Sequence, residues 1–333
     1  MKGTLTVCAF MALAACTPPD HDHVVTATGW MDASEMSLTL PHEHVLVDFI
    51  GADSITAGRY NQDSAFNKIL PYVIEFKNAG GKTIVECTPA YLGRDPGLLK
   101  RLSDASGIKF ITNTGYYGAV GEKYLPKHAS TESADEIANR WITEWNEGID
   151  STGITPGFMK LSADKGPLSA TQAKLIRAAA ITHLETGLPI AVHNGDGTAA
   201  QQEVGILEET GVSAEAFIWV HAQNEKDSTI HKSMAQRGAW VEFDGLNENN
   251  VDRYVTYLKY AKTEEFLDKV LISHDAGWYH VGEPGGGEYR GYLTLLNTLL
   301  PRLVTEGFTE GEIKMITWET PGRAFAIKKR KRD

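Results

Sequence analysis

Two histidines separated by one residue end an apolar run near the start of the chain, in SLTLPHEHVLVDF (Ser37 to Phe49). The flanking residues favour a β-strand, and Pro41 stands directly before His42 and His44. Imidazole nitrogens are common ligands of divalent metals, so the pair is either part of a loop that happens to be polar or part of a metal site. A metal site would require further ligands downstream, at positions that the fold brings close to the pair.

Further polar residues with suitable chemistry lie at or near the ends of other apolar runs. They are Lys160 in GFMKLS, His193 in IAVHNGDG, His221 in IWVHAQNE and Asp275 in LISHDAG. Each one alone is weak evidence, because single histidines are common at strand ends and a buried lysine can simply pair with a carboxylate. Their joint occurrence is hard to explain by accident, since an unpaired buried polar group costs roughly 2–7 kcal/mol. Bound metal ions would offset that cost.

The elements that must position these residues alternate between short apolar runs and longer helical patterns. Strands are expected at residues 38–47, 82–88, 108–114, 157–162, 188–194, 216–222, 238–244 and 269–275, and helices at 64–80, 133–149, 169–187 and 247–267. Apolar strands separated by helices predict parallel strands joined by right-handed crossovers. About eight such units fit an α/β fold of the (β/α)8 TIM-barrel type, with an open doubly wound sheet as the alternative. In a barrel, the C-terminal strand ends meet at one mouth, so the polar residues would share one pocket.

Composition limits the classes to which the protein can belong. Of the 333 residues, 42% are hydrophobic and 23% are charged, which is typical of a globular protein. The formal net charge of −11 argues against nucleic acid or an anionic membrane as the main partner. The basic end KKRKRD (328–333) is expected to be a solvated tail. Because no break in composition divides the chain, we predict a single domain over residues 24–333.

The N-terminus has the features of an export signal. A basic residue, an apolar stretch and small residues make up residues 1–15, and LAAC (13–16) resembles a bacterial lipobox. We predict a lipoprotein-type signal peptide, lipidation of Cys16 and a tether at 16–23, with simple cleavage and release as the alternative. The protein would be exported, periplasmic or anchored, and would contact the membrane only through its lipid. Cys87 is then the one cysteine left in the domain, so no intrachain disulfide is expected.

The ordered set of motifs resembles the phosphotriesterase-like branch of the amidohydrolase superfamily. The resemblance extends from about Val24 to about Lys328, nearly the whole mature chain. It rests on LPHEHV, KTIVECTPAYLGRD, NTGYY, GFMKLSADKGPLSATQAKLIRAAA, VHNGDGTAAQQ, VHAQNEKD, ISHDAG and IKMITWETPGRAFAI. It implies a metal-dependent hydrolase with a binuclear site of two divalent ions, usually zinc, at the C-terminal strand ends.

The resemblance also implies how the ligands are shared between the two ions. The expected ligands are His42, His44 and Asp275 for the more buried ion, His193 and His221 for the more exposed ion, and Lys160 for both. Lys160 would act as a carbamate formed with CO2, because a free lysine with a pKa of about 10.4 is a cation. In the implied mechanism, ions roughly 3.5–4 Å apart share a hydroxide that attacks the substrate, and Asp275 takes the proton. Glu43, between the two histidines, is expected to point the other way and to be structural.

The substrate is less clearly indicated by the sequence. NTGYY resembles a lactonase segment whose tyrosine lies near the lactone, and Tyr117 matches it, with a packing aromatic as the alternative. Gly245 stands where phosphotriesterases proper have His and homoserine-lactone lactonases usually have Arg. Asn224 stands where an Asp of the proton relay is expected. We predict hydrolysis of a carboxylic ester or lactone, with Asp275, Lys160 and Tyr117 as the catalytic residues.

Two alternatives to that activity stay open. One is a phosphotriesterase that hydrolyses organophosphates, and the other is a lipid-anchored binding protein that has lost catalysis. The expected partner is a small-molecule ester, lactone or phosphotriester, and the resemblance implies a homodimer. The short glycine-rich segment 276–291 is expected to form a flexible lid that carries Trp278 and Tyr279.

Overall fold

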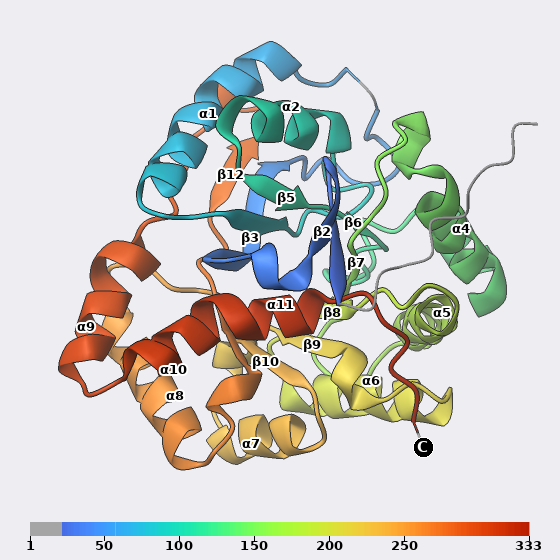
Figure 1. Cartoon of the computed structure of the whole chain (residues 1–333). Helices are drawn as coiled ribbons and strands as arrows, with labels where there is room; N and C mark the ends of the chain where they lie inside the picture. The colour runs from blue at the N-terminus through green and yellow to red at the C-terminus, as the bar shows by residue number, and fades with distance from the viewer. Residues whose placement is uncertain (1–21, 57, 333) are drawn as a thin grey trace, which may run out of the picture.

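The computed structural model describes residues 22–56 and 58–332 of the chain. The predicted signal peptide, Cys16 and most of the predicted tether lie outside the described residues. β1 begins at His23, one residue before the predicted start of the domain. Figure 1 shows helices arranged around a central group of strands.

Strands and helices alternate along most of the described chain. The strands are β1 (His23–Thr26), β2 (Gly29–Asp32), β3 (Thr39–Val47), β4 (Thr83–Glu86), β5 (Lys109–Ile111), β6 (Asn113–Thr114), β7 (Phe158–Ser162), β8 (Ile190–His193), β9 (Phe217–Val220), β10 (Trp240–Phe243), β11 (Val270–Ile272) and β12 (Gly277–His280). The helices are α1 (Gln62–Asn78), α2 (Pro96–Ser106), α3 (His128–Thr131), α4 (Ala134–Glu147), α5 (Ala170–Thr186), α6 (Gly197–Glu209), α7 (Ser228–Gln236), α8 (Val251–Thr263), α9 (Leu300–Thr305), α10 (Glu310–Lys314) and α11 (Thr320–Phe325).

Two interrupted strands close the parallel sheet on itself. Only Thr112 separates β5 from β6, and β5 pairs with β4 while β6 pairs with β7. Likewise β11 pairs with β10, and β12, which follows it in the chain, pairs with β3. Counting each interrupted pair as one strand, the wall formed by the described residues has eight parallel positions and no free edge. The predicted (β/α)8 TIM barrel is therefore confirmed, and every predicted strand is present.

The strands separate two hydrophobic clusters, because alternate side chains face opposite sides of a strand. One cluster lies inside the barrel and includes Val85, Ile111, Ala191, Ile218 and Leu271. The larger cluster lies between the outer faces of the strands and the helices. A polar residue on an inward-facing position is consequently buried inside the barrel.

The helices begin and end where local capping allows. Ser133 and Glu136 cap the start of α4 reciprocally, and Ser169 and Gln172 do the same for α5. Gly187, at φ 81°, ends α5 in the left-handed conformation that favours glycine. The bounds of α4 and α5 lie within one or two residues of the helical patterns predicted at 133–149 and 169–187.

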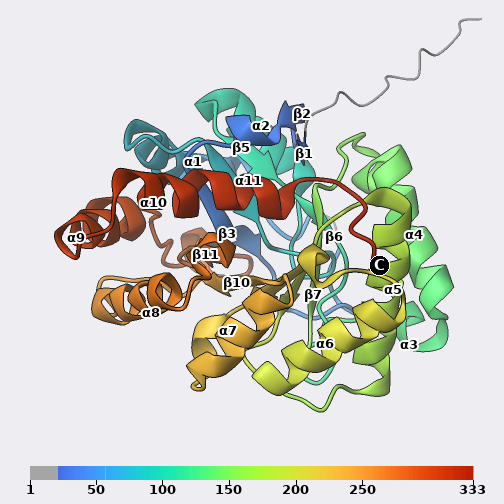
Figure 2. The same ribbon diagram turned by 60° about the horizontal axis from the view of Figure 1, so that its bottom comes forward.

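One end of the barrel is covered by elements that the sequence analysis did not predict. β1 and β2 form an antiparallel hairpin, and Ala27 N donates to Phe110 O at 2.7 Å. The end of α11 lies close to this hairpin, as Figure 2 shows. Ile327 N donates to His23 O at 2.8 Å, which joins the two chain regions. Within the described residues, no helix combines the length and apolar character needed to cross a membrane.

Candidate metal centre

His42 and His44 both lie inside the mouth of the barrel near the C-terminal end of β3. Their rings are buried, with centroids 5.4 Å apart. His44 Nδ1 lies 2.7 Å from Thr88 Oγ1, while His44 Nε2 points toward Asp275. The outer nitrogen of the ring is thus engaged and the inner nitrogen remains available to a ligand.

Asp275 completes a group of three with the two histidines. Its Oδ1 lies 3.2 Å from His44 Nε2 and 3.8 Å from His42 Nε2. Within the described chain, Asp275 Oδ1 and His42 Nε2 are buried atoms without a hydrogen-bond partner. The ligand atoms of the three residues lie within 4.8 Å of one another. A shared cation satisfies such a group, so the residues fit a metal ion at this point.

His193, at the end of β8, and His221, directly after β9, lie beside this group. His221 Nε2 is 2.6 Å from His193 Nδ1, and the His221 ring centroid is 5.1 Å from that of His42. His221 takes the left-handed conformation at φ 63°, which is uncommon for a residue other than glycine. Its Nδ1 lies 2.5 Å from Asp244 Oδ1, so its Nε2 faces the mouth.

Lys160 comes from β7, one strand before His193. Its side chain is 1% exposed, and it pairs in register with Ala191 of β8 on the inner face. It is close enough for its charge to lower the pKa values of both His44 and His193. The structure therefore brings all six predicted ligands to one mouth, and their role in holding metal stays a prediction.

At His44, His193 and Asp275, electrostatics favour the protonation states that bind metal. Burial lowers the pKa of His44 to about 4 and lowers that of His193 well below its ordinary value. Burial would raise the pKa of Asp275, but the neighbouring His44 and His42 hold it at about 2. Neutral imidazoles and an ionised carboxylate are the forms that coordinate metals.

Two inward-facing acids, Glu242 on β10 and Asp244 directly after it, belong to the same site and were not among the predicted residues. Asp244 is fully buried and accepts from the His221 backbone N at 2.9 Å, and its Oδ2 lies 3.2 Å from His42 Nδ1. Glu242 Oε2 also lies 3.2 Å from His42 Nδ1. The signal in the sequence was WVEFD, where acids alternate with apolar residues in a strand that should be buried.

Comparison with known proteins shows the family to which this chain belongs. A sequence model of the phosphotriesterase family matches residues 22–325. The chain belongs to the phosphotriesterase family. Members of this family include hydrolases of ester and phosphoester bonds, so the chain is a hydrolase. The predicted resemblance is thereby confirmed.

Relatives within the phosphotriesterase family carry names that imply different substrates. The chain is 29% identical to an aryldialkylphosphatase of Saccharolobus solfataricus, over 89% of this chain and 97% of the relative. It is 24% identical to an N-acetyltaurine hydrolase of Danio rerio, over 92% and 98%. The organophosphorus hydrolase of Deinococcus radiodurans has a similar structure, with a TM-score of 0.82 at 28% identity over 95% of this chain and 100% of that one.

The two departures from the pattern of phosphotriesterases proper have visible consequences. A Cβ on Gly245 would lie 3.0 Å from Gln223 Nε2 and 3.3 Å from the Tyr254 hydroxyl oxygen. Gln223 Nε2 donates to Asp244 Oδ1 at 2.7 Å. The amide of Gln223 therefore lies where a side chain at position 245 would begin. Asn224 packs against Gly195, and its amide does not titrate.

Tyr117 lies at the mouth beside the candidate ligands. Its hydroxyl oxygen is 3.0 Å from His193 Nε2, and its ring is half-buried. Burial raises the pKa of this hydroxyl, so it stays protonated and can donate a hydrogen bond. The position fits either contact with a substrate or support of the His193 ring.

Aromatic residues form one side of the mouth. The Trp278 ring centroid lies 4.7 Å from that of His44, and Phe49 lies 5.6 Å from Trp278. The expectation that Trp278 and Tyr279 sit on a flexible lid is wrong, because both belong to β12, which pairs with β3, and Tyr279 is buried. Strand pairing holds Trp278 against His44, where its ring forms an apolar wall of the mouth.

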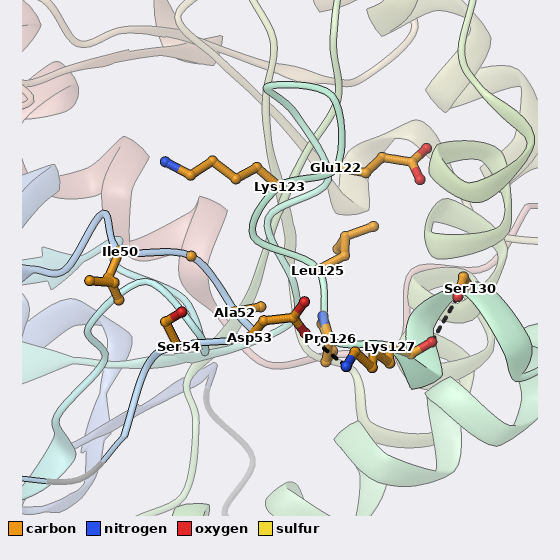
Figure 3. Close-up of a pocket in the computed structure, with 11 residues that line it drawn as sticks. Ile50, Ala52, Asp53, Ser54, Glu122, Lys123, Leu125, Pro126, Lys127 and Ser130 are labelled. Carbon is orange, nitrogen blue, oxygen red and sulfur yellow. Dashed lines mark hydrogen bonds and ion pairs between the residues drawn. The ribbon is translucent and has the colours of Figure 1, made fainter.

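A cavity of about 440 Å³ lies beside the mouth, between the segments 50–54 and 122–130 (Figure 3). Lys127 Nζ lies 3.7 Å from Asp53 Oδ1 across it. None of the six predicted ligands lines this cavity. It is therefore a hollow between two surface loops and does not itself contain the metal-binding groups.

Proposed function

We propose that the protein is a binuclear metal-dependent hydrolase of carboxylic esters or lactones. The observation that carries the proposal is the pair of buried atoms His42 Nε2 and Asp275 Oδ1, which lie 3.8 Å apart and have no hydrogen-bond partner among the described residues. His44 Nε2 points to the same place, and the outer nitrogens of the rings are already engaged. Two divalent ions, most readily zinc, suit this set of nitrogen and carboxylate ligands.

The ligands divide between two positions. His42, His44 and Asp275 would hold one ion, and His193 and His221 would hold the other. Lys160 would bridge them once its neutral amine has added to CO2 and lost one proton, which gives a carbamate anion. When bound, the ions would polarise the substrate oxygen and lower the pKa of water toward about 7.

The remaining roles fall to side chains of the chain itself. Asp275 is ionised and can accept the proton released during attack. The Tyr117 hydroxyl is protonated and can donate to an oxygen of the substrate. Trp278 and Phe49 can contact the apolar part of the substrate and exclude water from one side.

A carboxylic ester or lactone is favoured over a phosphotriester for two reasons. Tyr117 occupies the position that the lactonase resemblance assigns to a substrate-side tyrosine. Gly245 stands where phosphotriesterases proper have a histidine, and here the Gln223 amide contacts Asp244. Phosphotriesters are expected as weaker substrates, because both reactions develop charge on an oxygen beside a metal.

Metal content and a substrate panel test this proposal together. The purified chain should contain about two metal ions, and it should hydrolyse lactones faster than aryl esters, phosphotriesters or N-acetyltaurine. Two ions with faster phosphotriester turnover would favour the organophosphate hydrolase. A chain that stays metal-free in zinc-supplemented medium would favour a binding protein and overturn the proposal.

Export and lipidation of Cys16 are a separate part of the proposal. They rest on the sequence of residues 1–16, with its apolar stretch and LAAC end. Radiolabelled fatty acid should be incorporated by the native chain and not by the Cys16→Ser variant. Secretion of an unlabelled, cleaved chain would show release in place of anchoring.

A further inference from the structure

Glu242 is an acid in a place where an apolar residue would be expected. It pairs in register with Leu271 of β11, which belongs to the cluster inside the barrel. Val241 and Phe243, its neighbours on β10, belong to the outer cluster that contacts the helices. The alternation of the strand therefore directs Glu242 inward, where it is 1% exposed.

The contacts of Glu242 point to His42. Glu242 Oε2 lies 3.2 Å from His42 Nδ1, on the opposite side of the ring from the nitrogen that faces Asp275. Glu242 Oε1 is buried and has no hydrogen-bond partner in the part of the chain that the structure describes. An acid buried this way is costly unless an interaction requires it.

Asp244 is also close to His42 Nδ1, at 3.2 Å, but it has other partners. Its Oδ1 lies 2.5 Å from His221 Nδ1 and accepts from Gln223 Nε2 at 2.7 Å, and its Oδ2 accepts from the His221 backbone N at 2.9 Å. Asp244 is thus committed mainly to His221. Glu242 makes its one side-chain hydrogen bond within the described chain to His42.

We propose that Glu242 is a positioning residue for the metal centre. It would hold His42 so that Nε2 faces the ion shared with His44 and Asp275. This inference rests on the proposed binuclear site. Carboxylates that accept from the outer nitrogen of a ligand histidine fix its orientation and raise its basicity. Glu242 then orients His42, and Asp244 mainly orients His221. Loss of Glu242 should therefore weaken the binding of one ion more than that of the other.

Two variants separate positioning from packing. Glu242→Gln keeps the size of the side chain and an oxygen acceptor but cannot ionise, whereas Glu242→Leu loses the acceptor as well. Competition with a zinc chelator should show one ion bound roughly 10–100-fold more weakly in Glu242→Leu, with Glu242→Gln between it and the native chain. The second ion should keep its native affinity. Glu203→Gln, a buried acid that contacts Asn194, is the matched control and should bind both ions normally.

Each outcome decides the question. Thermal melting in excess chelator should give the two Glu242 variants a stability equal to or above that of the native chain, because a buried acid has been removed. Native affinity for both ions in both variants, in a native chain that binds two ions, would overturn the inference alone. Three ions in the native chain and two in Glu242→Gln would make Glu242 a ligand and also overturn it. No ion in the native chain would overturn the proposed function with it.

Discussion

Replacing Glu203 with glutamine should stabilise the protein in alkaline solution, because the native carboxyl group is held in its protonated form. Glu203 lies on α6, fully buried, and its Oε2 accepts from Asn194 Nδ2 at 2.5 Å. Its Oε1 lacks a hydrogen-bond partner within the described chain. Burial raises the pKa of this carboxyl from 4.5 to about 8, against the opposing effect of the Asn194 hydrogen bond.

The size of the effect follows from linkage between protonation and folding. The folded pKa is higher than the unfolded one, so the native chain is most stable below 4.5 and loses stability as the pH rises through about 8. One pKa unit corresponds to about 1.36 kcal/mol. Between pH 6 and pH 8 the free energy of unfolding of the native chain should fall by about 2 kcal/mol, and that of Glu203→Gln should not show this fall. Glutamine is neutral and keeps an acceptor for Asn194, so it reproduces the protonated acid.

Chemical denaturation at pH 6 and pH 8 measures this difference. Both proteins are unfolded in excess chelator, so that metal binding does not contribute, and Glu209→Gln on the same helix is the control because Glu209 is exposed. The stability gained by Glu203→Gln should be about 2 kcal/mol larger at pH 8 than at pH 6, and that of the control should be unchanged. An equal gain at the two pH values would refute the reasoning, since it would mean that Glu203 is not protonated in the fold.

Three further substitutions test the site. Lys160→Ala should remove most of the metal and reduce turnover at least about 100-fold while the far-ultraviolet circular dichroism is unchanged; retention of full metal and rate would disprove the carbamate assignment. Tyr117→Phe should slow lactone hydrolysis roughly 10-fold and leave aryl esters unaffected, as expected for one lost hydrogen bond, whereas no change would leave Tyr117 as a packing residue. Gly277→Ala should lose metal and stability, because its Cβ would lie 1.7 Å from His44 O at φ 93°. Gly282→Ala has a similar φ of 94° with nothing within 4 Å, so it should cost only about 1–3 kcal/mol of backbone strain and keep its metal; equal metal loss in both would contradict the steric argument.

The barrel could be predicted from the sequence because its signals are local. Each predicted strand is a short apolar run that ends near a polar residue or a turn, and β8 (Ile190–His193) is an example. The hairpin of β1 and β2 and the strand β12 were not predicted. β12 is held by pairing with β3, more than 200 residues earlier, and Trp278 and Tyr279 alone carry no sign of that partner.

The candidate ligands could be predicted from their positions, but the residues that orient them could not. Asp244 and Glu242 stand out in WVEFD as acids in a buried strand, yet no nearby residue in the sequence predicts that His42 is their partner. Their contact with His42 is made inside the barrel, between residues about 200 positions apart on strands that are not paired with each other. Such residues are recognised only once the strand register is known, because the register decides which side chains share the interior.

The contacts of Glu43 explain why an acid stands between His42 and His44. It faces away from them, and its Oε1 lies 2.8 Å from Ser273 Oγ and 3.1 Å from His274 N, while its Oε2 accepts from Ala276 N at 2.7 Å. These contacts lie on both sides of Asp275, in the break between β11 and β12 where the last strand changes its partner from β10 to β3. Asp275 takes a left-handed φ of 51° there, a conformation that needs support from its surroundings. The motif His-Glu-His therefore supplies two candidate ligands from one face of β3 and, from the other, the carboxylate that fixes the third. Closure of the barrel and placement of Asp275 both depend on the segment between β11 and β12. The site is therefore complete only when β12 has paired with β3.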